Sequence, residues 1–141
     1  MHRRMRGTYV VLVTLILSMA VGCGLNKNEI ANIYKNLGVF HQALNKGDYA
    51  AIIRTTDVEF RKSSQQDDLV APFRAVHEKY GRILDSVPEG YDVRALIGAA
   101  RITFHQHTRF EHGVLEEHFT YMVRDHEPFL LRYEVKPITT P

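Results

Sequence analysis

The hydrophobic period of the chain changes at Gly81, and no other feature constrains the fold as strongly. Before Gly81, apolar residues recur at helical spacing, first along Ile30, Ile33, Tyr34, Leu37, the half-polar His41 and Leu44. A second stripe of this kind comprises Leu69, Phe73, Val76 and Tyr80. After Gly81, apolar and polar residues alternate, which is typical of strands with one covered face. A helical half followed by a strand half predicts an α+β fold.

Capping and turn residues divide the helical half into three helices. Asn26 or Asn28 suits the N-cap of the first helix, because a short polar side chain accepts a hydrogen bond from the first turn. Gly47 suits the left-handed position after this helix, and Asp48 suits the N-cap of a short second helix. Pro72 fits the first turn of the third helix, where a missing N–H costs least.

The strand half predicts a sheet of about four antiparallel strands. Residues 82–87 form the first strand, and Pro88-Glu89-Gly90 suits a turn after it. Three clearer strands comprise residues 101–110, 114–124 and 129–136, with His112-Gly113 as a two-residue turn between the first two. That turn sets a register in which His107 lies opposite His118.

Alternation along these strands gives the sheet one mostly apolar face and one polar face. The apolar face collects Ile102, Phe104, Gln106, Phe119, Tyr121 and Val123, joined by Phe129, Leu131, Tyr133 and Val135 if the last loop is odd in length. The polar face collects His105, His107, Arg109, Glu116, His118 and Thr120. The predicted architecture is therefore α+β, with three N-terminal helices packed on a curved antiparallel sheet as a cone-shaped roll.

The junction between the first two helices carries a family resemblance. The segment Ala43–Ile52, the third helix ending in Lys79-Tyr80-Gly81, and the long terminal strands resemble the nuclear transport factor 2-like superfamily of the cystatin-like fold. The resemblance covers roughly residues 28–137 and is nearest to small exported members of unknown function. It implies a cone around a pocket that binds small apolar molecules, or supports isomerisation or dehydration, or serves as a non-catalytic module. Since related folds pair through their sheets, a homodimer through the polar face is a further expectation.

The first 23 residues have the features of a secretory leader. Positive charge at Arg3, Arg4 and Arg6 precedes an apolar run, which is too short to span a membrane comfortably. The run ends in Ala20-Val21-Gly22-Cys23, which resembles the bacterial lipobox. The resemblance implies cleavage before Cys23 and a diacylglycerol on its sulfur.

Acylation at Cys23 predicts where the protein is found and how its chain is divided. Cleavage removes 22 of the 141 residues and leaves a short linker to residue 27, a single domain at 28–137 and a tail at 138–141. Two or three acyl chains anchor a protein stably. The expected location is the bacterial cell envelope, and the outer membrane facing the periplasm if the host has two membranes, because Gly24 replaces the Asp of an inner-membrane retention signal.

Composition without the leader excludes several functions. Three of the 18 basic residues lie in the leader, so 15 Lys and Arg face 16 Asp and Glu, a net charge of −1 with His neutral. Such a chain has no basic stripe, and no nucleic-acid partner is expected. Once Cys23 is acylated no thiol remains for a disulfide, a metal or nucleophilic catalysis. No phosphate-binding glycine loop is present in the sequence, and no cofactor is expected.

The apolar sheet face offers one candidate site. Its polar members are Gln106, Thr108, Glu117, Tyr121 and Tyr133, and the predicted register places Thr108 opposite Glu117. Glu117 is the best candidate for a catalytic base, with Tyr121 or Tyr133 as hydrogen-bond donor. The alternative is that Glu117 lies at the rim in water and the tyrosines belong to the core. That alternative is favoured, since no histidine falls on this face and one carboxylate is weak evidence.

The polar sheet face offers a second candidate site. His105, His107 and His118 share this face, and three imidazoles on one face suit a zinc or copper site. The alternative is a solvated face with Arg109 and Glu116 as an ordinary cross-strand ion pair.

Taken together, these features favour a membrane-anchored binding or accessory domain without catalysis. Its expected partner is another envelope protein or a small apolar ligand. A small pocket enzyme using Glu117 and a histidine metal-binding lipoprotein are the two alternatives.

Overall fold

The computed structural model describes residues 26–63 and 69–138, so Cys23 and the leader lie outside the described residues. The helices are α1 (Lys27–Lys46), α2 (Tyr49–Arg54), α3 (Val58–Ser63) and α4 (Ala71–Tyr80). The strands are β1 (Ile83–Leu96), β2 (Ala99–Phe110), β3 (Gly113–Arg124) and β4 (Glu127–Pro137). They form one antiparallel sheet in the order β1-β2-β3-β4, which confirms the α+β class. None of the helices in the described part of the chain is long and apolar enough to cross a membrane.

The predicted helix boundaries at the start of the domain are confirmed by their caps. Asn26 and Glu29 form a reciprocal capping box at the start of α1. Gly47 ends α1 in the left-handed conformation with φ of 67°. The Asp48 side chain then accepts a hydrogen bond from the Ala51 backbone N–H and caps α2. These caps depend on neighbouring residues alone, so the sequence is sufficient to predict them.

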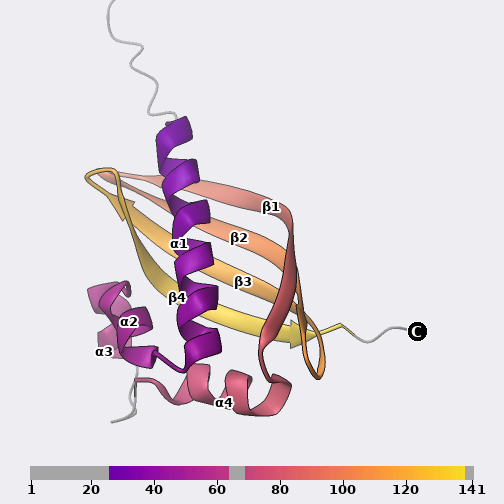
Figure 1. The fold of residues 1–141 in the computed structure, drawn as a ribbon. Coiled ribbons are helices and arrows are strands. Elements are labelled where there is room, and N and C mark those ends of the chain that lie inside the picture. The colour runs from indigo at the N-terminus through magenta and orange to yellow at the C-terminus, as the bar shows by residue number, and fades with distance from the viewer. Residues whose placement is uncertain (1–25, 64–68, 139–141) are drawn as a thin grey trace, which may run out of the picture.

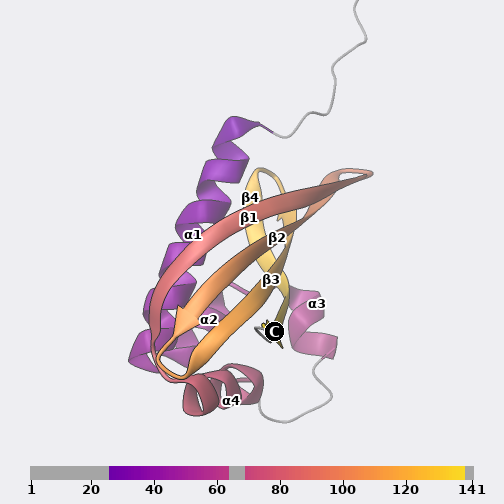
Figure 2. The ribbon, with the colours of Figure 1, turned by 90° about the vertical axis from the view of Figure 1, so that its right-hand side faces the viewer.

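The helices and the sheet form two layers with the core between them. Helix α1 runs along one face of the curved sheet, α4 lies at one end of it, and α2 and α3 lie near β4 (Figures 1 and 2). Buried aromatic and aliphatic side chains from α1, α4 and this helix-covered face form the core: Ile33, Leu37, Phe40, Leu44, Phe73, Phe104, Phe119 and Leu130. The other face, called the open face below, carries Thr103, His105, His107, Glu116, His118 and Thr120.

Asn45 fastens the end of α1 to the start of the sheet. Its side-chain amide donates to the Ile83 carbonyl at 3.0 Å and accepts from the Ile83 N–H at 2.7 Å. Both backbone groups lie at the beginning of an edge strand, so a side chain can pair with them as a neighbouring strand would. The two hydrogen bonds hold α1 in place along the sheet.

A short helix not predicted from sequence, α3, follows a segment that joins the sheet. The Asp57 N–H donates to the Leu130 carbonyl at 2.7 Å, and the Leu130 N–H donates to the Thr55 carbonyl at 2.9 Å. Asp57 then starts α3 by accepting from the Glu59 N–H at 2.8 Å. Its other carboxylate oxygen lies 2.7 Å from Nη1 of Arg124. Asp57 therefore links α3, β3 and β4 from a fully buried position.

The predicted register of β2 and β3 is wrong by two residues, although the faces are right. The turn is Glu111-His112 rather than His112-Gly113, and His118 lies opposite His105 rather than His107. A shift by two residues moves every partner but keeps each side chain on its face. The turn is held from outside the hairpin, because the Glu111 carboxylate accepts from the Arg82 N–H at 2.8 Å.

Two irregularities change the predicted strands. Pro88-Glu89-Gly90 is a bulge within one long β1 rather than a turn, and the chain reverses at Ile97-Gly98 instead. A second irregularity lies in β4, where Leu130 pairs with Tyr121 but Arg132 pairs with Thr120. The predicted placement of Phe129 and Leu131 on the helix-covered face assumed a loop of odd length and is wrong, because the turn Asp125-His126 has two residues and places Leu130 in the core instead. The irregularity after Leu130 then returns Tyr133 and Val135 to the helix-covered face. Tyr133 and Val135 pack against the core as predicted.

Candidate functional site

Four side chains converge on the buried carboxylate of Glu117. Its Oε2 accepts from Nε2 of His41 at 2.9 Å, from Nε2 of Gln106 at 2.9 Å and from the Thr108 hydroxyl. Its Oε1 accepts from the Tyr133 hydroxyl at 2.7 Å. Glu117 is fully buried, so the prediction that it lies at the rim in water is wrong. Of the five residues predicted for this face, Tyr121 is buried nearby without a hydrogen bond to Glu117 among the described contacts.

The hydrogen bonds decide the charge of Glu117. Burial alone would raise its pKa, but the hydrogen bond and positive charge of His41, with the hydroxyls of Thr108 and Tyr133, outweigh burial and hold the pKa below its ordinary value. Burial and the charge of Glu117 raise the pKa of Tyr121, and they act together with the hydrogen bond to raise that of Tyr133. The cluster is therefore a carboxylate anion held by hydrogen-bond donors, and its tyrosine hydroxyl keeps its proton.

His41 is the member of this cluster that the sequence reasoning missed. It belongs to the apolar stripe of α1 and reaches the sheet from the covering helix, 76 residues away in sequence from Glu117. The statement that no histidine falls on the apolar sheet face is correct for the strands alone. The signal that points to His41 is a polar side chain within the stripe of a helix predicted to cover a strand glutamate.

This arrangement is better suited to holding the fold than to proton transfer. A carboxylate with a lowered pKa is a weak base, and a general base needs contact with a substrate. Glu117 has no exposed surface, and it does not line the open-face groove described below. The contacts of Glu117 therefore join α1 to three strands across the core.

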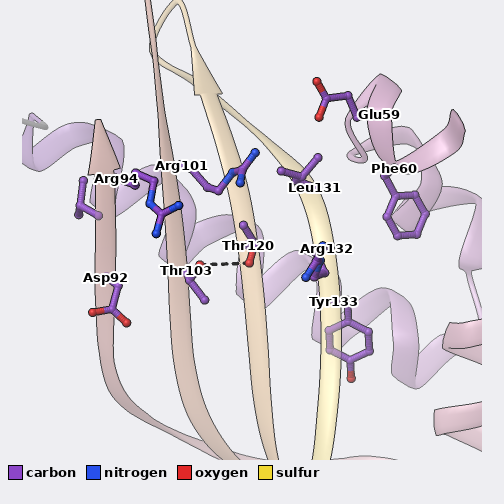
Figure 3. A pocket seen from close by; sticks show the side chains of 11 residues that line it. Glu59, Phe60, Asp92, Arg94, Arg101, Thr103, Thr120, Leu131, Arg132 and Tyr133 are labelled. Carbon is purple, nitrogen blue, oxygen red and sulfur yellow. Dashed lines mark hydrogen bonds between the residues drawn. The ribbon is translucent and has the colours of Figure 1, made fainter. Parts of the chain in front are cut away.

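A groove on the open face is the best candidate for a ligand site. It has a volume of about 740 Å³, within the range of small-molecule sites. Figure 3 shows Arg94, Arg101, Thr103, Thr120 and Arg132 arranged across the sheet. Other lining residues include Glu59, Phe60, Leu131 and Tyr133 from α3 and β4. The hydroxyls of Thr103 and Thr120 are hydrogen-bonded to each other at 3.1 Å on the floor.

Two arginines face each other in this groove without an acidic partner. Arg94 on β1 is the direct cross-strand neighbour of Arg101 on β2. Within residues 26–63 and 69–138, neither side chain has a carboxylate within 4.0 Å. The Nε of Arg101 is buried and has no hydrogen-bond partner there either. Like charges directly opposite each other destabilise a sheet. An anion bound between Arg94 and Arg101 would therefore reduce their repulsion.

The structure brings two of the three predicted metal-ligating histidines together. The rings of His105 and His118 lie 4.5 Å apart between centroids, and Glu116 contacts His118 at 2.6 Å. His107 instead lies 3.1 Å from Glu89 of the β1 bulge. The expected ion pair between Arg109 and Glu116 is absent from the described contacts, because Arg109 lies opposite Val114.

No protein-family model, curated protein or solved structure matches this chain. The resemblance to the nuclear transport factor 2-like superfamily therefore stays an expectation from the sequence. Because one fold supports many functions, what the protein does has to be inferred from its own residues.

Proposed function

We propose that this protein is a lipid-anchored, non-catalytic binding domain of the bacterial envelope. Its ligand is a small molecule with an anionic group joined to an apolar part, and its site is the open-face groove. The lipobox-like sequence ending at Cys23 supports the anchor. The observation that carries the ligand class is Arg101, which faces Arg94 and has an Nε that is buried without a partner.

The anionic group is recognised at the arginines. A guanidinium presents several N–H donors in a planar fork that matches the oxygens of a carboxylate, sulfonate or phosphate. Arg94 and Arg101 lie side by side, and an anion between them would remove their mutual repulsion. The hydroxyls of Thr103 and Thr120 lie one cross-strand row away and offer further hydrogen bonds.

The apolar part of the ligand is recognised at the β4 side of the groove. Phe60, Leu131 and Tyr133 line that side, and Phe60 belongs to α3, which lies beside β4. Aromatic and aliphatic walls stabilise apolar groups by removing their surface from water. A ligand that spans the groove would thus place its charge over β1 and β2 and its apolar part near α3.

Anilinonaphthalene sulfonate is a suitable probe, because it joins a sulfonate to aromatic rings. We expect the folded protein to bind it with one-to-one stoichiometry in a fluorescence titration. Replacing Arg101 by methionine should weaken binding about tenfold or more, as expected for the loss of a charged hydrogen bond. The free energy of unfolding of the same variant should not fall, since the substitution relieves repulsion with Arg94.

The control for this titration is Arg109→Met. Arg109 is an exposed arginine on the same strand and the same face, but it does not line the groove. Its replacement should change the affinity less than about twofold. Equal weakening by both substitutions would mean that the probe responds to overall charge, and unchanged binding by Arg101→Met would place the ligand elsewhere. Either result overturns the proposed site.

The proposed acylation of Cys23 is tested separately from the groove. In a bacterial host, Cys23→Ser should abolish incorporation of a radiolabelled fatty acid, because a hydroxyl does not replace the thiolate in attack on the lipid donor. The wild-type protein should partition into the detergent phase after extraction, and Gly24→Ala should partition in the same way. Fatty-acid labelling that survives Cys23→Ser would contradict the lipoprotein assignment.

A further inference from the structure

We propose that His105, Glu116 and His118 bind one divalent transition-metal ion, of the Zn²⁺ type, on the open face of the sheet. His105 on β2 lies directly opposite His118 on β3. Glu116 lies two residues before His118, so its side chain points to the same side. One donor atom from each of the three residues lies within 4.8 Å of the other two. This site adjoins the anionic-ligand groove at Asp92, which lines the groove, but none of its three metal-binding residues lines the groove.

The donor set is one that zinc sites use. Two imidazoles and one carboxylate hold Zn²⁺ in several hydrolases and leave a fourth position open. Donor atoms around a tetrahedral Zn²⁺ lie about 3.4 Å apart, given metal–ligand distances near 2.1 Å. His118 and Glu116 lie 2.6 Å apart, and His105 lies within 4.8 Å of both. Rotations of these side chains are therefore enough to bring the donors to metal-binding distances.

Asp92 supplies the outer contact that metal-ligating histidines usually have. Its Oδ2 lies 2.9 Å from Nε2 of His105. When Nε2–H of a histidine donates a hydrogen bond to a carboxylate, Nδ1 carries the lone pair that a metal binds. On the other side of the cluster, Glu134 lies opposite His118 and adds negative charge. The side chains of His105 and His118 are only 28% and 15% exposed, so the ion would be partly shielded from water.

His107, which the sequence predicted to be a metal ligand, lies outside the metal site proposed here. His107 lies opposite Glu116, but its Nδ1 lies 3.1 Å from Glu89 and its side chain is well exposed. It lies outside the group whose donors converge. The proposed site therefore needs His105 and His118 but not His107, and this difference is testable.

Competition with a chromophoric zinc chelator tests the site, with Zn²⁺ alone as the probe. The full chain is purified in detergent as Cys23→Ser, so that no thiol competes for the metal. We expect one Zn²⁺ per chain at neutral pH. His105→Gln and His118→Gln should each weaken binding about tenfold or more, and Asp92→Asn about tenfold. Glutamine keeps the size of the side chain on a solvent-facing strand, and circular dichroism checks that each variant is folded.

The controls are His107→Gln and His112→Gln. His107 lies on the same face outside the converging donors, and His112 lies in the exposed β2–β3 turn. Both should keep the wild-type affinity within about twofold. Uptake below one ion per chain, wild-type affinity in the double variant of His105 and His118, or equal losses in the controls would each overturn the proposal.

Discussion

Glu117→Leu is expected to lower the free energy of unfolding by about 3 kcal/mol. Because leucine fills a similar volume, the loss of stability comes from removal of the carboxylate and not from a cavity. The variant leaves Gln106, Thr108 and Tyr133 as buried donors without the carboxylate that accepts from them, and a buried donor left without an acceptor costs about 1–3 kcal/mol. Urea unfolding at neutral pH, followed by circular dichroism, measures this difference.

The matched control is Glu134→Gln, which replaces an exposed glutamate on the neighbouring strand. Surface substitutions of this kind usually stay within about 0.5 kcal/mol. Glu117→Gln should fall between the two, since an amide keeps one acceptor but lacks the charge that attracts His41. A Glu117→Leu protein as stable as the wild type would show that the four hydrogen bonds contribute nothing net to stability.

Arg124→Met is expected to cost about 2 kcal/mol. The substitution leaves the fully buried side chain of Asp57 without its cation, while the remaining carboxylate oxygen still accepts from the Glu59 N–H. The expected cost is below that of a fully buried pair because Arg124 is itself 38% exposed. Urea unfolding of the single variant gives the size of the loss.

A double-mutant cycle separates the ion pair from other effects of removing Arg124. Asp57→Asn keeps an oxygen for the Glu59 N–H but removes the charge. If the pair is coupled, Arg124→Met should cost at least about 1 kcal/mol less in the Asp57→Asn background. Arg132→Met, which replaces an exposed arginine of β4, is the control, and its cost in free energy of unfolding is compared with that of Arg124→Met. Equal costs of Arg124→Met in both backgrounds would rule out the coupling.

The sequence was sufficient for the helix caps at the start of the domain, which depend on near neighbours. Asn26, Gly47 and Asp48 cap helices through hydrogen bonds or backbone conformations within a few residues. Alternation in β2 and β3 likewise assigns Gln106, Thr108 and Glu117 to one face, because a strand has a period of two. These three residues do meet, although the predicted register that paired Thr108 with Glu117 is wrong.

Distant contacts decided what the sequence did not predict. The β2–β3 turn lies two residues from its predicted register, and Glu111 in this turn accepts a hydrogen bond from the backbone N–H of Arg82, 29 residues away. The irregularity in β4 lies where Leu130 pairs with the segment at Thr56. His41 meets Glu117 only after α1 has packed on the sheet. Alternation carries no information on such contacts, and each of them changed a predicted site or strand.

The end of the sheet beside the α1 N-terminus has a consequence for orientation at a bilayer. There His126 lies 2.6 Å from Glu29, and the β1–β2 turn exposes the whole side chain of Ile97 at the same end (Figure 1). Under the proposed acylation of Cys23, three residues, 24–26, separate Cys23 from Lys27 at the start of α1, a reach of about 14 Å. The bilayer would then lie near this end of the domain. The strands would then extend away from the bilayer surface, and α4 would lie up to about 40 Å from it in the aqueous space. The open-face groove would remain accessible from the side of the domain.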